Sequence, residues 1–420
     1  MRILWFTNTP SLASQALNDK GNIGGWIAAL ESEVAKVEEI ELAVAFHYGT
    51  SEKKQFSIGK TKYFSFPNPI LSKGHTKGII SRWQHKIEPI GIVDCYLEVI
   101  DQFKPDIIHI FGTELAYGLI IEKLKVPVIV WIQGNLSVYE KKWFSGLSNY
   151  AILKHSSIKN IIYGYGTWHL FYLFKKRVKR EKVMMRNCGY IIGRTDWDRR
   201  ISLILSPNSK YFHCDDLLRS EFYSSKRWLN ASHTRMILHS TLSALNYKGI
   251  ETILETALLL KKDNLLNFEW HVAGLNGNEE LVHIIQKFYG HKFTDFGVVF
   301  HGNLNPKTLI KMLLESDCYI HPSHIENSPN SVCEAMILGV PVIASYAGGT
   351  SNLIRNGIDG VLVQDGDPYS FAGAILEMYK DNDLKNKISY NAEAQAREKH
   401  NKVKVLQDLL KIYEAVLMDK

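Results

Sequence analysis

The chain has 420 residues, of which 45% are hydrophobic, and a formal net charge of +7 at pH 7. A chain of this length can bury a full hydrophobic core and favours two or three globular domains. No apolar run reaches the roughly 18 residues of a membrane-spanning helix, and the start, MRILWFTNTP, turns polar too soon for a signal peptide. We therefore expect a globular protein of the cytoplasm.

The candidate metal ligands are few and poorly spaced. The five cysteines lie far apart, without a CxxC pair or a nearby histidine, which predicts isolated thiols and no zinc site or disulfide framework. Three Asp-x-Asp pairs, at 196–198, 365–367 and 381–383, mimic a metal site. Asp367 stands before Pro368, however, and this order is typical of a helix N-cap followed by its first residue. We expect no metal.

Residues 141–186 form the most basic part of the sequence. They contain eleven lysines and arginines and a single acid, Glu181, and aromatic and aliphatic residues adjoin the run from Lys175 to Arg180. Such a pattern suits an anionic membrane surface, where each cation contributes about 1 kcal/mol, or a single-stranded nucleic acid. A helix with a buried aromatic face and a solvated basic face explains it equally simply. We expect an anionic membrane surface as the partner and no nucleic acid.

Short runs rich in β-branched residues alternate with helical patterns along the chain, as in parallel α/β sheets. The first series of expected strands comprises residues 2–8, 40–46, 106–112, 127–133 and 190–195. The second series comprises residues 235–240, 268–274, 297–302, 318–323, 341–346 and 360–365. A polar stretch, 220–233, separates the two series.

This order of elements predicts an α/β fold with two doubly wound, Rossmann-like domains. The N-terminal domain is expected over residues 1–225 and the C-terminal domain over 226–400. Residues 401–420 should form a final helix, because the apolar residues of 402–417 recur at helical spacing and need a surface to cover.

Two glutamates, Glu326 and Glu334, stand eight positions apart in HPSHIENSPNSVCEAM, residues 321–336. Ser331 and Glu334 match a capping box, which would leave Glu334 with a structural task alone. Glu326, in contrast, follows the expected strand 318–323, and ligands of open parallel sheets bind at the carboxyl ends of the strands. The helix that starts near Ser331 also offers its free amides to an anion.

Carboxylates beside an anion site suit a nucleoside diphosphate that bears a sugar. Glu334 can accept hydrogen bonds from the two ribose hydroxyls, and Glu326 from a hydroxyl of the sugar. The amides of Asn330 and Ser331, with Ser328 next to them, would then face the phosphates. A pair of glutamates at this spacing is common by chance, so the spacing alone leaves the capping box open.

Several longer motifs resemble retaining glycosyltransferases of family four. Residues 322–363, PSHIENSPNSVCEAMILGVPVIASYAGGTSNLIRNGIDGVLV, contain the two glutamates with seven residues between them and then Ala-Met, Gly-x-Pro-Val-Ile-Ala, Gly-Gly and Gly-x-Leu-Val in the family's order. Upstream, NYKGIETILETALLL (246–260), WHVAG (270–274) and FHGNL (300–304) are also similar to the family. Near the N-terminus, NIGGWIAALESEV (22–34) and PDIIHIFGTE (105–114) resemble its glycine loop and its Asp-x-x-His strand.

The resemblance implies a GT-B fold, in which the two Rossmann-like domains face each other across a cleft. The acceptor would bind on the N-terminal side and the nucleotide sugar on the C-terminal side, and the final helix would return to the N-terminal domain. Transfer would retain the anomeric configuration, because the acceptor attacks from the front face of the sugar. A donor phosphate oxygen would help to deprotonate the acceptor hydroxyl, so no carboxylate nucleophile is needed. No metal or other cofactor is implied.

The resemblance also assigns roles to individual residues. Glu326 would hold the transferred sugar, and Lys248, before Gly249, would offset the negative charge that builds on the leaving diphosphate. Gly24 and Gly25 would offer amides to a phosphate at the start of a helix. On the acceptor side, Gln133 stands where many members carry a histidine, and it can hydrogen-bond a hydroxyl but cannot take a proton. His109 is expected either to pack inside its strand or to face the cleft.

Besides Gln133, the sequence differs from the family at a second place, which concerns phosphate binding. Family members pair the lysine with an arginine a few residues earlier. No arginine occurs between Arg235 and Arg355, so Lys248 would work with backbone amides or with the hydroxyls of Ser240, Thr241 or Ser243.

Three functions follow from these features. The first is a retaining transferase that moves a hexose or a related sugar from a nucleotide donor to a glycan, expected on a lipid carrier at the inner face of a bacterial membrane, in surface polysaccharide assembly. The second is a GT-B epimerase or synthase with a soluble substrate. The third is a nucleotide-sugar-binding protein that no longer catalyses.

Overall fold

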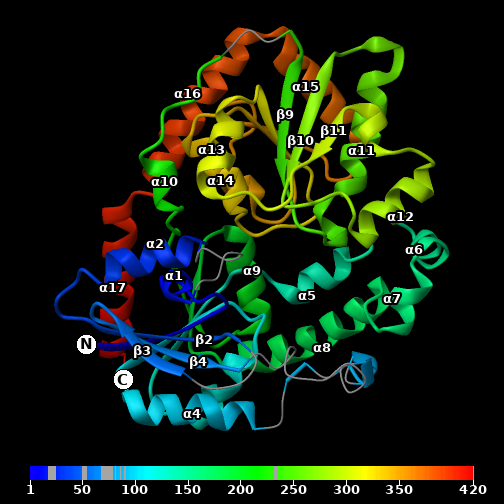
Figure 1. Ribbon diagram of the computed structural model, residues 1–420. Coiled ribbons are helices and arrows are strands. Elements are labelled where there is room, and N and C mark those ends of the chain that lie inside the picture. The colour runs from blue at the N-terminus through cyan, green and yellow to red at the C-terminus, as the bar shows by residue number, and fades with distance from the viewer. Residues whose placement is uncertain are drawn as a thin grey trace. The chain divides into compact units, whose positions relative to one another are not determined.

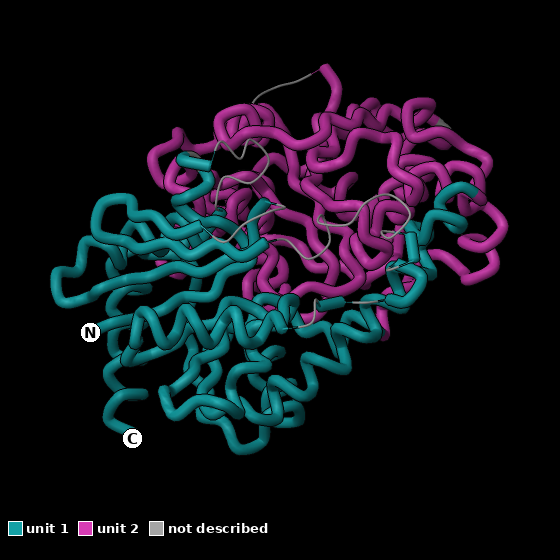
Figure 2. Tube along the Cα trace, turned by 60° about the horizontal axis from the view of Figure 1, so that its bottom comes forward, with its two compact units in different colours: residues 1–140, 159–217, 400–420 teal, residues 141–158, 218–399 magenta. Residues whose placement is uncertain are grey.

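The computed structural model describes residues 1–17, 25–49, 54–67, 79–80, 82–85, 87–88, 91–230 and 234–419. The chain forms two compact units. Unit 1 comprises residues 1–140, 159–217 and 400–420, and unit 2 comprises residues 141–158 and 218–399 (Figure 2).

This division corrects the expected domain boundaries at two places. The chain enters unit 2 at Leu218 and not at residue 226. Residues 141–158, expected in the N-terminal domain, belong to unit 2, where the Ser157 amide donates to the Glu280 carboxylate at 2.9 Å. The sequence could not predict this, because the pairing joins segments more than a hundred residues apart.

The sheet of unit 1 has the strand order β3-β4-β2-β1-β5-β6-β7-β8. All neighbouring strands are parallel except β3 and β4, which are antiparallel. The strands are β1 (Arg2–Thr7), β2 (Glu41–His47), β3 (Lys54–Ile58), β4 (Thr61–Phe66), β5 (Ile107–Phe111), β6 (Val128–Trp131), β7 (Tyr190–Gly193) and β8 (Lys210–His213). The five strands expected from the first series are confirmed, whereas β3, β4 and β8 were missed. β3 and β8 are largely exposed, and β4, although mostly buried, has polar residues between its aromatic ones and so lacks a continuous apolar run.

Alternate residues of β1 point to opposite faces of this sheet, as the period of two requires. Trp5 packs in one apolar cluster, with Leu409 and Tyr413 of the last helix, and Phe6 packs in the other, with Tyr96. The Trp5 indole donates to the Tyr413 hydroxyl at 3.0 Å. The last helix, α17 (Lys402–Met418), thus packs its apolar face on unit 1, as expected, and contacts α2 (Gly25–Val34).

The other helical elements of unit 1 connect and cover its strands (Figure 1). They are α1 (Ala13–Ala16), α4 (Ile92–Phe103), η1 (Ala116–Lys123), α5 (Leu136–Tyr139), α8 (Thr167–Arg186) and α9 (Asp196–Leu205), and η2 (Glu140–Lys142) and α7 (Ile158–Ile162) stand at its junctions with unit 2. In the part of the chain that the structure describes, no helix is both long and apolar enough to cross a membrane.

The sheet of unit 2 is entirely parallel, with the order β11-β10-β9-β12-β13-β14. Its strands are β9 (Met236–Thr241), β10 (Phe268–Ala273), β11 (Val298–Phe300), β12 (Cys318–His321), β13 (Val342–Ser345) and β14 (Val361–Val363). All six match the second series of expected strands, because buried parallel strands are short, continuous apolar runs.

Helices cover both faces of this second sheet. They are α6 (Asn149–His155), α10 (Ser220–Tyr223), α11 (Ile250–Lys261), α12 (Glu280–Tyr289), α13 (Pro306–Leu314), α14 (Asn330–Ile337), α15 (Pro368–Lys380) and α16 (Asn382–Lys399). Short 3-10 turns are η3 (Asn246–Lys248), η4 (Lys262–Asn264), η5 (Phe293–Phe296) and η6 (Thr350–Asn352). Asn305 caps α13, and Asp367 caps α15 ahead of Pro368, as predicted.

Candidate functional site

The strand order of unit 2 places a topological switch point at β9. Its neighbours are β10 on one side and β12 on the other, so the connections leaving β9 and β12 run in opposite directions. Ligands of open α/β sheets bind in the crevice that such a divergence creates at the carboxyl ends of the strands. The β9 connection carries Lys248, and the β12 connection carries Glu326.

Gly249 allows these two connections to meet. It adopts a left-handed conformation, with φ of 70°, between η3 and α11. A Cβ atom at this position would lie 2.1 Å from the carbonyl oxygen of Pro322. The backbone of the β12 connection therefore approaches Gly249 closely.

Lys248 and Glu326, predicted as partners in catalysis, form an ion pair in the structure. The Ser323 hydroxyl donates to the same carboxylate oxygen at 3.4 Å. The proposed help from Ser240 is wrong, because its hydroxyl lies in the core, where it donates to the Ile320 carbonyl and accepts from the Trp270 indole.

Glu334 lies on the second turn of α14, and its carboxylate receives two hydrogen bonds from the guanidinium of Arg219. The Nε and Nη2 atoms of Arg219 lie 2.6 Å from Oε1 and Oε2 respectively. The capping-box interpretation is wrong, since the N-cap is Pro329 and Ser331 already belongs to the helix. Arg219 was missed because nothing in its local sequence marks it, and the pair spans 115 positions.

Buried polar atoms gather around the start of α14. Ser328 Oγ, Asn330 Oδ1, Asn246 Nδ2 and both ring nitrogens of His321 have no hydrogen-bond partner among the described residues. Burial lowers the pKa of His321 to about 4, so the ring is neutral at pH 7. Because buried polar groups are normally paired, several unpaired ones at one strand end indicate a place for a polar ligand.

A second ion pair lies in the same connection. His324 Nε2 stands 2.6 Å from the carboxylate of Glu251, in the first turn of α11. Burial opposes protonation of His324, but the hydrogen bond and charge of Glu251, together with Asp365, outweigh it and raise the pKa. Lys142 Nζ contacts Asp365 at 2.9 Å. Asp365, Glu251 and His324 border a polar cavity of about 250 Å³, whose other lining residues are Ser145, Gly146, Thr252, Glu255 and Gly366.

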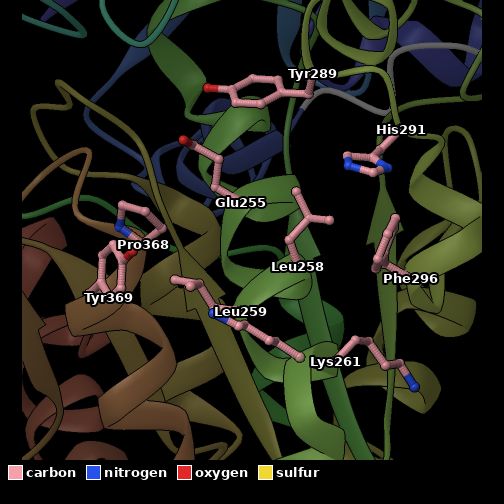
Figure 3. A pocket seen from close by; sticks show the side chains of 10 residues that line it. Glu255, Leu258, Leu259, Lys261, Tyr289, His291, Phe296, Pro368 and Tyr369 are labelled. Atoms are coloured by element: carbon pink, nitrogen blue, oxygen red, sulfur yellow. The ribbon is translucent and has the colours of Figure 1, made fainter.

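A larger cavity, of about 490 Å³, lies along the C-terminal half of α11 and is lined by none of the predicted site residues. Figure 3 shows Leu258 and Leu259 of α11 between Tyr289 and Phe296 on one side and Tyr369 on the other. Its mainly apolar wall lacks the paired charges of the switch point, so a charged ligand is better suited to the switch point.

Of the two places expected for His109, the structure shows the packed one, so the acceptor-side alternative is wrong. Its side chain is fully buried, Nδ1 contacts the Tyr413 hydroxyl at 2.7 Å, and its ring stacks on Phe111 and Trp131. Burial lowers the pKa of His109 to about 3. Its alternating position in β5 points it into the core beneath α17, which decides between the two roles left open by the sequence.

Gln133 follows β6 at the carboxyl end of the unit 1 sheet, where Arg194 Nη2 donates to its main-chain carbonyl at 3.0 Å. Glu114, which sequence reasoning missed, follows β5 at the same edge and accepts from the Asn8 amide at 3.1 Å. Burial raises the pKa of Glu114. Gln133 thus keeps its predicted place at a strand end, and its role stays a prediction.

The glycine loop is described only in part, since Gly24 lies outside the described residues. Gly25 begins α2 with φ of 56°, and a Cβ atom there would meet nothing within 4 Å. The role of both glycines in phosphate binding stays a prediction.

The basic segment 141–186 contains charges that are already paired. Arg180 is buried, forms an ion pair with Glu88 and donates to the carbonyls of Thr113 and Glu114. Glu181 accepts from the amides of Leu136 and Ser137. Arg180 therefore stabilises the fold and cannot face a membrane.

Within the described part of the chain, no group of three His, Cys, Asp or Glu residues is placed to hold a metal ion. Asp198 forms the capping box of α9 with Thr195, and Asp196 forms ion pairs with Arg199 and Arg200. Asp381 ends α15 and accepts from the Leu384 amide at 2.8 Å.

Two Rossmann-like units, one with paired charges at its switch point, define the class of proteins with the GT-B fold. Residues 226–395 match the family model of "Glycosyl transferases group 1", which confirms the resemblance for this part of the chain. The matched segment contains Lys248, Glu326 and Glu334.

Two curated relatives are similar over parts of the chain. The Methanocaldococcus jannaschii glycosyltransferase MJ1069 is 26% identical over 172 residues, 41% of this chain and 43% of that protein. The UDP-Gal:alpha-D-GlcNAc-diphosphoundecaprenol alpha-1,3-galactosyltransferase of Escherichia coli is 30% identical over 109 residues, 26% of this chain and 28% of that protein. The matched part thus spans less than half the length of each relative.

Among solved structures, sucrose-phosphate synthase of Thermosynechococcus elongatus has a similar fold. The similarity covers 100% of both chains, with a TM-score of 0.73 and 13% sequence identity. At this identity the likeness supports the GT-B fold and carries nothing about the substrate.

Proposed function

We propose that this protein is a retaining glycosyltransferase that moves a hexose or a related sugar from a nucleotide donor to a glycan acceptor. The observation that carries the proposal is the pair of cation–carboxylate contacts, Lys248 with Glu326 and Arg219 with Glu334, at the switch point of unit 2. Carboxylates bind the hydroxyls of ribose and sugar, and cations with free helix amides bind the diphosphate. Since Lys248 can offset the leaving-group charge, the proposal requires no metal.

The proposed acceptor is a lipid-linked glycan at the inner face of the cytoplasmic membrane, in surface polysaccharide assembly. The E. coli relative is named for a UDP-galactose donor and a diphosphoundecaprenol acceptor, which supports both halves of the proposal by similarity. Gln133 and Glu114, at the carboxyl edge of the unit 1 sheet, are the proposed acceptor-side residues.

The first experiment is to measure which nucleotide the protein binds. We expect one of UDP, GDP, ADP or CMP to raise the melting temperature and to give a calorimetric binding isotherm. Glu334→Gln keeps the side-chain shape but weakens the charged hydrogen bonds to ribose, so its affinity should fall by about 1 to 3 kcal/mol. Tyr369→Ala, an exposed residue of the separate cavity, should bind like wild type.

Equal binding by wild type and Glu334→Gln would contradict the role of Glu334. Absence of binding to all four nucleotides would overturn the proposed function. Nucleotide binding without sugar transfer to any lipid-linked or soluble acceptor would favour a binding protein, and donor turnover without membranes would favour an epimerase or a synthase.

A surface of α8 supports the membrane part of the proposal. Tyr172, Lys176, Lys179 and Val183 are all exposed, and their spacing of four, three and four residues places them on one face of the helix. Two exposed apolar side chains with two lysines between them are typical of helices that lie on anionic membranes.

The double variant Lys176→Gln/Lys179→Gln should bind vesicles with anionic phospholipid roughly 30-fold more weakly, at about 1 kcal/mol for each lysine. Co-sedimentation with such vesicles measures the effect. Lys123→Gln/Lys125→Gln, which removes two exposed charges elsewhere on unit 1, is the matched control and should bind like wild type. If both double variants lost vesicle binding equally, the effect would come from net charge and not from this face of α8. If neither variant lost vesicle binding, the proposed membrane contact would be wrong.

A further inference from the structure

Arg219 is held in place by the core of unit 2. It directly follows Leu218 and precedes α10, and both Leu218 and Phe222 of this turn are fully buried in the cluster with Tyr319 and Met336. The guanidinium carbon lies 4.9 Å from the centre of the Phe222 ring. The backbone and side chain of Arg219 are therefore fixed before any ligand binds.

The contact with Glu334 has the geometry of a strong ion pair. Two parallel N–H donors of the guanidinium meet the two carboxylate oxygens, each at 2.6 Å, and the Glu334 side chain is only 7% exposed. Burial opposes the charge of Arg219, but the hydrogen bond and charge of Glu334 outweigh it and raise the pKa of the guanidinium. A bidentate pair of this kind fixes the orientation of the carboxylate as well as its charge.

The Arg219–Glu334 ion pair reduces electrostatic repulsion between the proposed donor site and its anionic ligand. Glu326 and Glu334 would each repel a nucleoside diphosphate, which is itself a strong anion. Lys248 offsets Glu326, and Arg219 offsets Glu334, so the two carboxylates meet the ligand as neutral pairs. An ionised carboxylate offers about four acceptor positions, so a guanidinium on one side leaves it able to accept ribose hydroxyls.

We propose that Arg219 is a positioning residue for nucleotide recognition, which orients Glu334 toward the ribose hydroxyls and offsets its charge. This inference rests on the proposed function, because it presumes that Glu334 binds the ribose of a nucleoside diphosphate. Arg219 acts through Glu334 and is not placed in contact with the ligand.

The test is a double-mutant cycle with two ligands, the nucleoside diphosphate that wild type binds and its 2′-deoxy form. Arg219→Gln should weaken binding of the ribonucleotide by about tenfold or more, and the 2′-deoxy form much less, so that discrimination between them falls. Arg219→Lys keeps the charge but loses the bidentate fork, so it should lie between wild type and Arg219→Gln. In the Glu334→Gln background, Arg219→Gln should have little further effect.

Arg227 supplies the matched control. Its Nε atom lies 2.9 Å from the Glu393 carboxylate and its guanidinium lies over the Tyr390 ring, the same pair of contacts at another place in unit 2. Arg227→Gln should leave discrimination against the 2′-deoxy form unchanged. If Arg219→Gln fails to fold because Glu334 is left unpaired, Arg219→Lys and the double variant keep the cycle measurable, since neither leaves a buried carboxylate without a cation.

The outcomes separate this inference from the proposed function. A wild-type protein that binds no nucleoside diphosphate overturns both. A wild-type protein that binds one, together with an Arg219→Gln variant of unchanged discrimination, overturns the role of Arg219 alone. An equal loss of affinity from Arg219→Gln with and without Glu334 also overturns it, because the arginine would then act independently of the carboxylate.

Discussion

Replacing Lys248 by methionine should lower the rate of sugar transfer by roughly 100- to 1,000-fold, the usual cost of removing one preorganised charge stabiliser. Negative charge grows on the diphosphate as its bond to the sugar breaks, so the lysine contributes more to the transition state than to the bound donor. Nucleotide affinity should therefore fall less than the rate. Single-turnover transfer assays and calorimetry measure the two quantities separately.

The loss of Lys248 also leaves Glu326 without its cation, and a second variant separates the two effects. Lys248→Met/Glu326→Gln removes both charges, and it should remain as slow as the single lysine variant if the lysine acts on the leaving group. Recovery of the rate in this double variant would show that the lysine serves only to neutralise Glu326. Lys262→Met, an exposed lysine just after α11, should behave like wild type.

The largest expected effect on stability comes from Gly249→Ala. The substitution forces a side chain into the left-handed conformation and places a Cβ atom 2.1 Å from the Pro322 carbonyl oxygen, so the β12 connection must move. We expect the free energy of unfolding to fall by about 2 to 4 kcal/mol, the range of strain and overpacking together. Denaturant unfolding measures it.

Gly290 provides the control for Gly249. It has φ of 73°, close to the 70° of Gly249, but a Cβ atom there would meet nothing within 4 Å. Gly290→Ala should therefore cost only about 1 kcal/mol, which reflects the backbone conformation alone. Equal losses in the two variants would mean that the approach to Pro322 has no energetic importance.

Local sequence patterns predicted most of the fold. Each strand expected in the two series is present, since a continuous apolar run is enough to specify a buried parallel strand. The patterns failed for β3 and β8, whose side chains are largely exposed, and for residues 141–158, whose place in unit 2 depends on contacts with Glu280 and Tyr247.

The sequence by itself determined the positions of Lys248, Glu326 and Glu334, because each stands in a motif that a strand end or helix start makes readable. Only the tertiary structure decided which charges meet. It paired Glu334 with Arg219 and turned His109 into the core. The physical reason is range: periodicity and caps act over a few residues, whereas ion pairs and burial join residues that the chain brings together only after it folds.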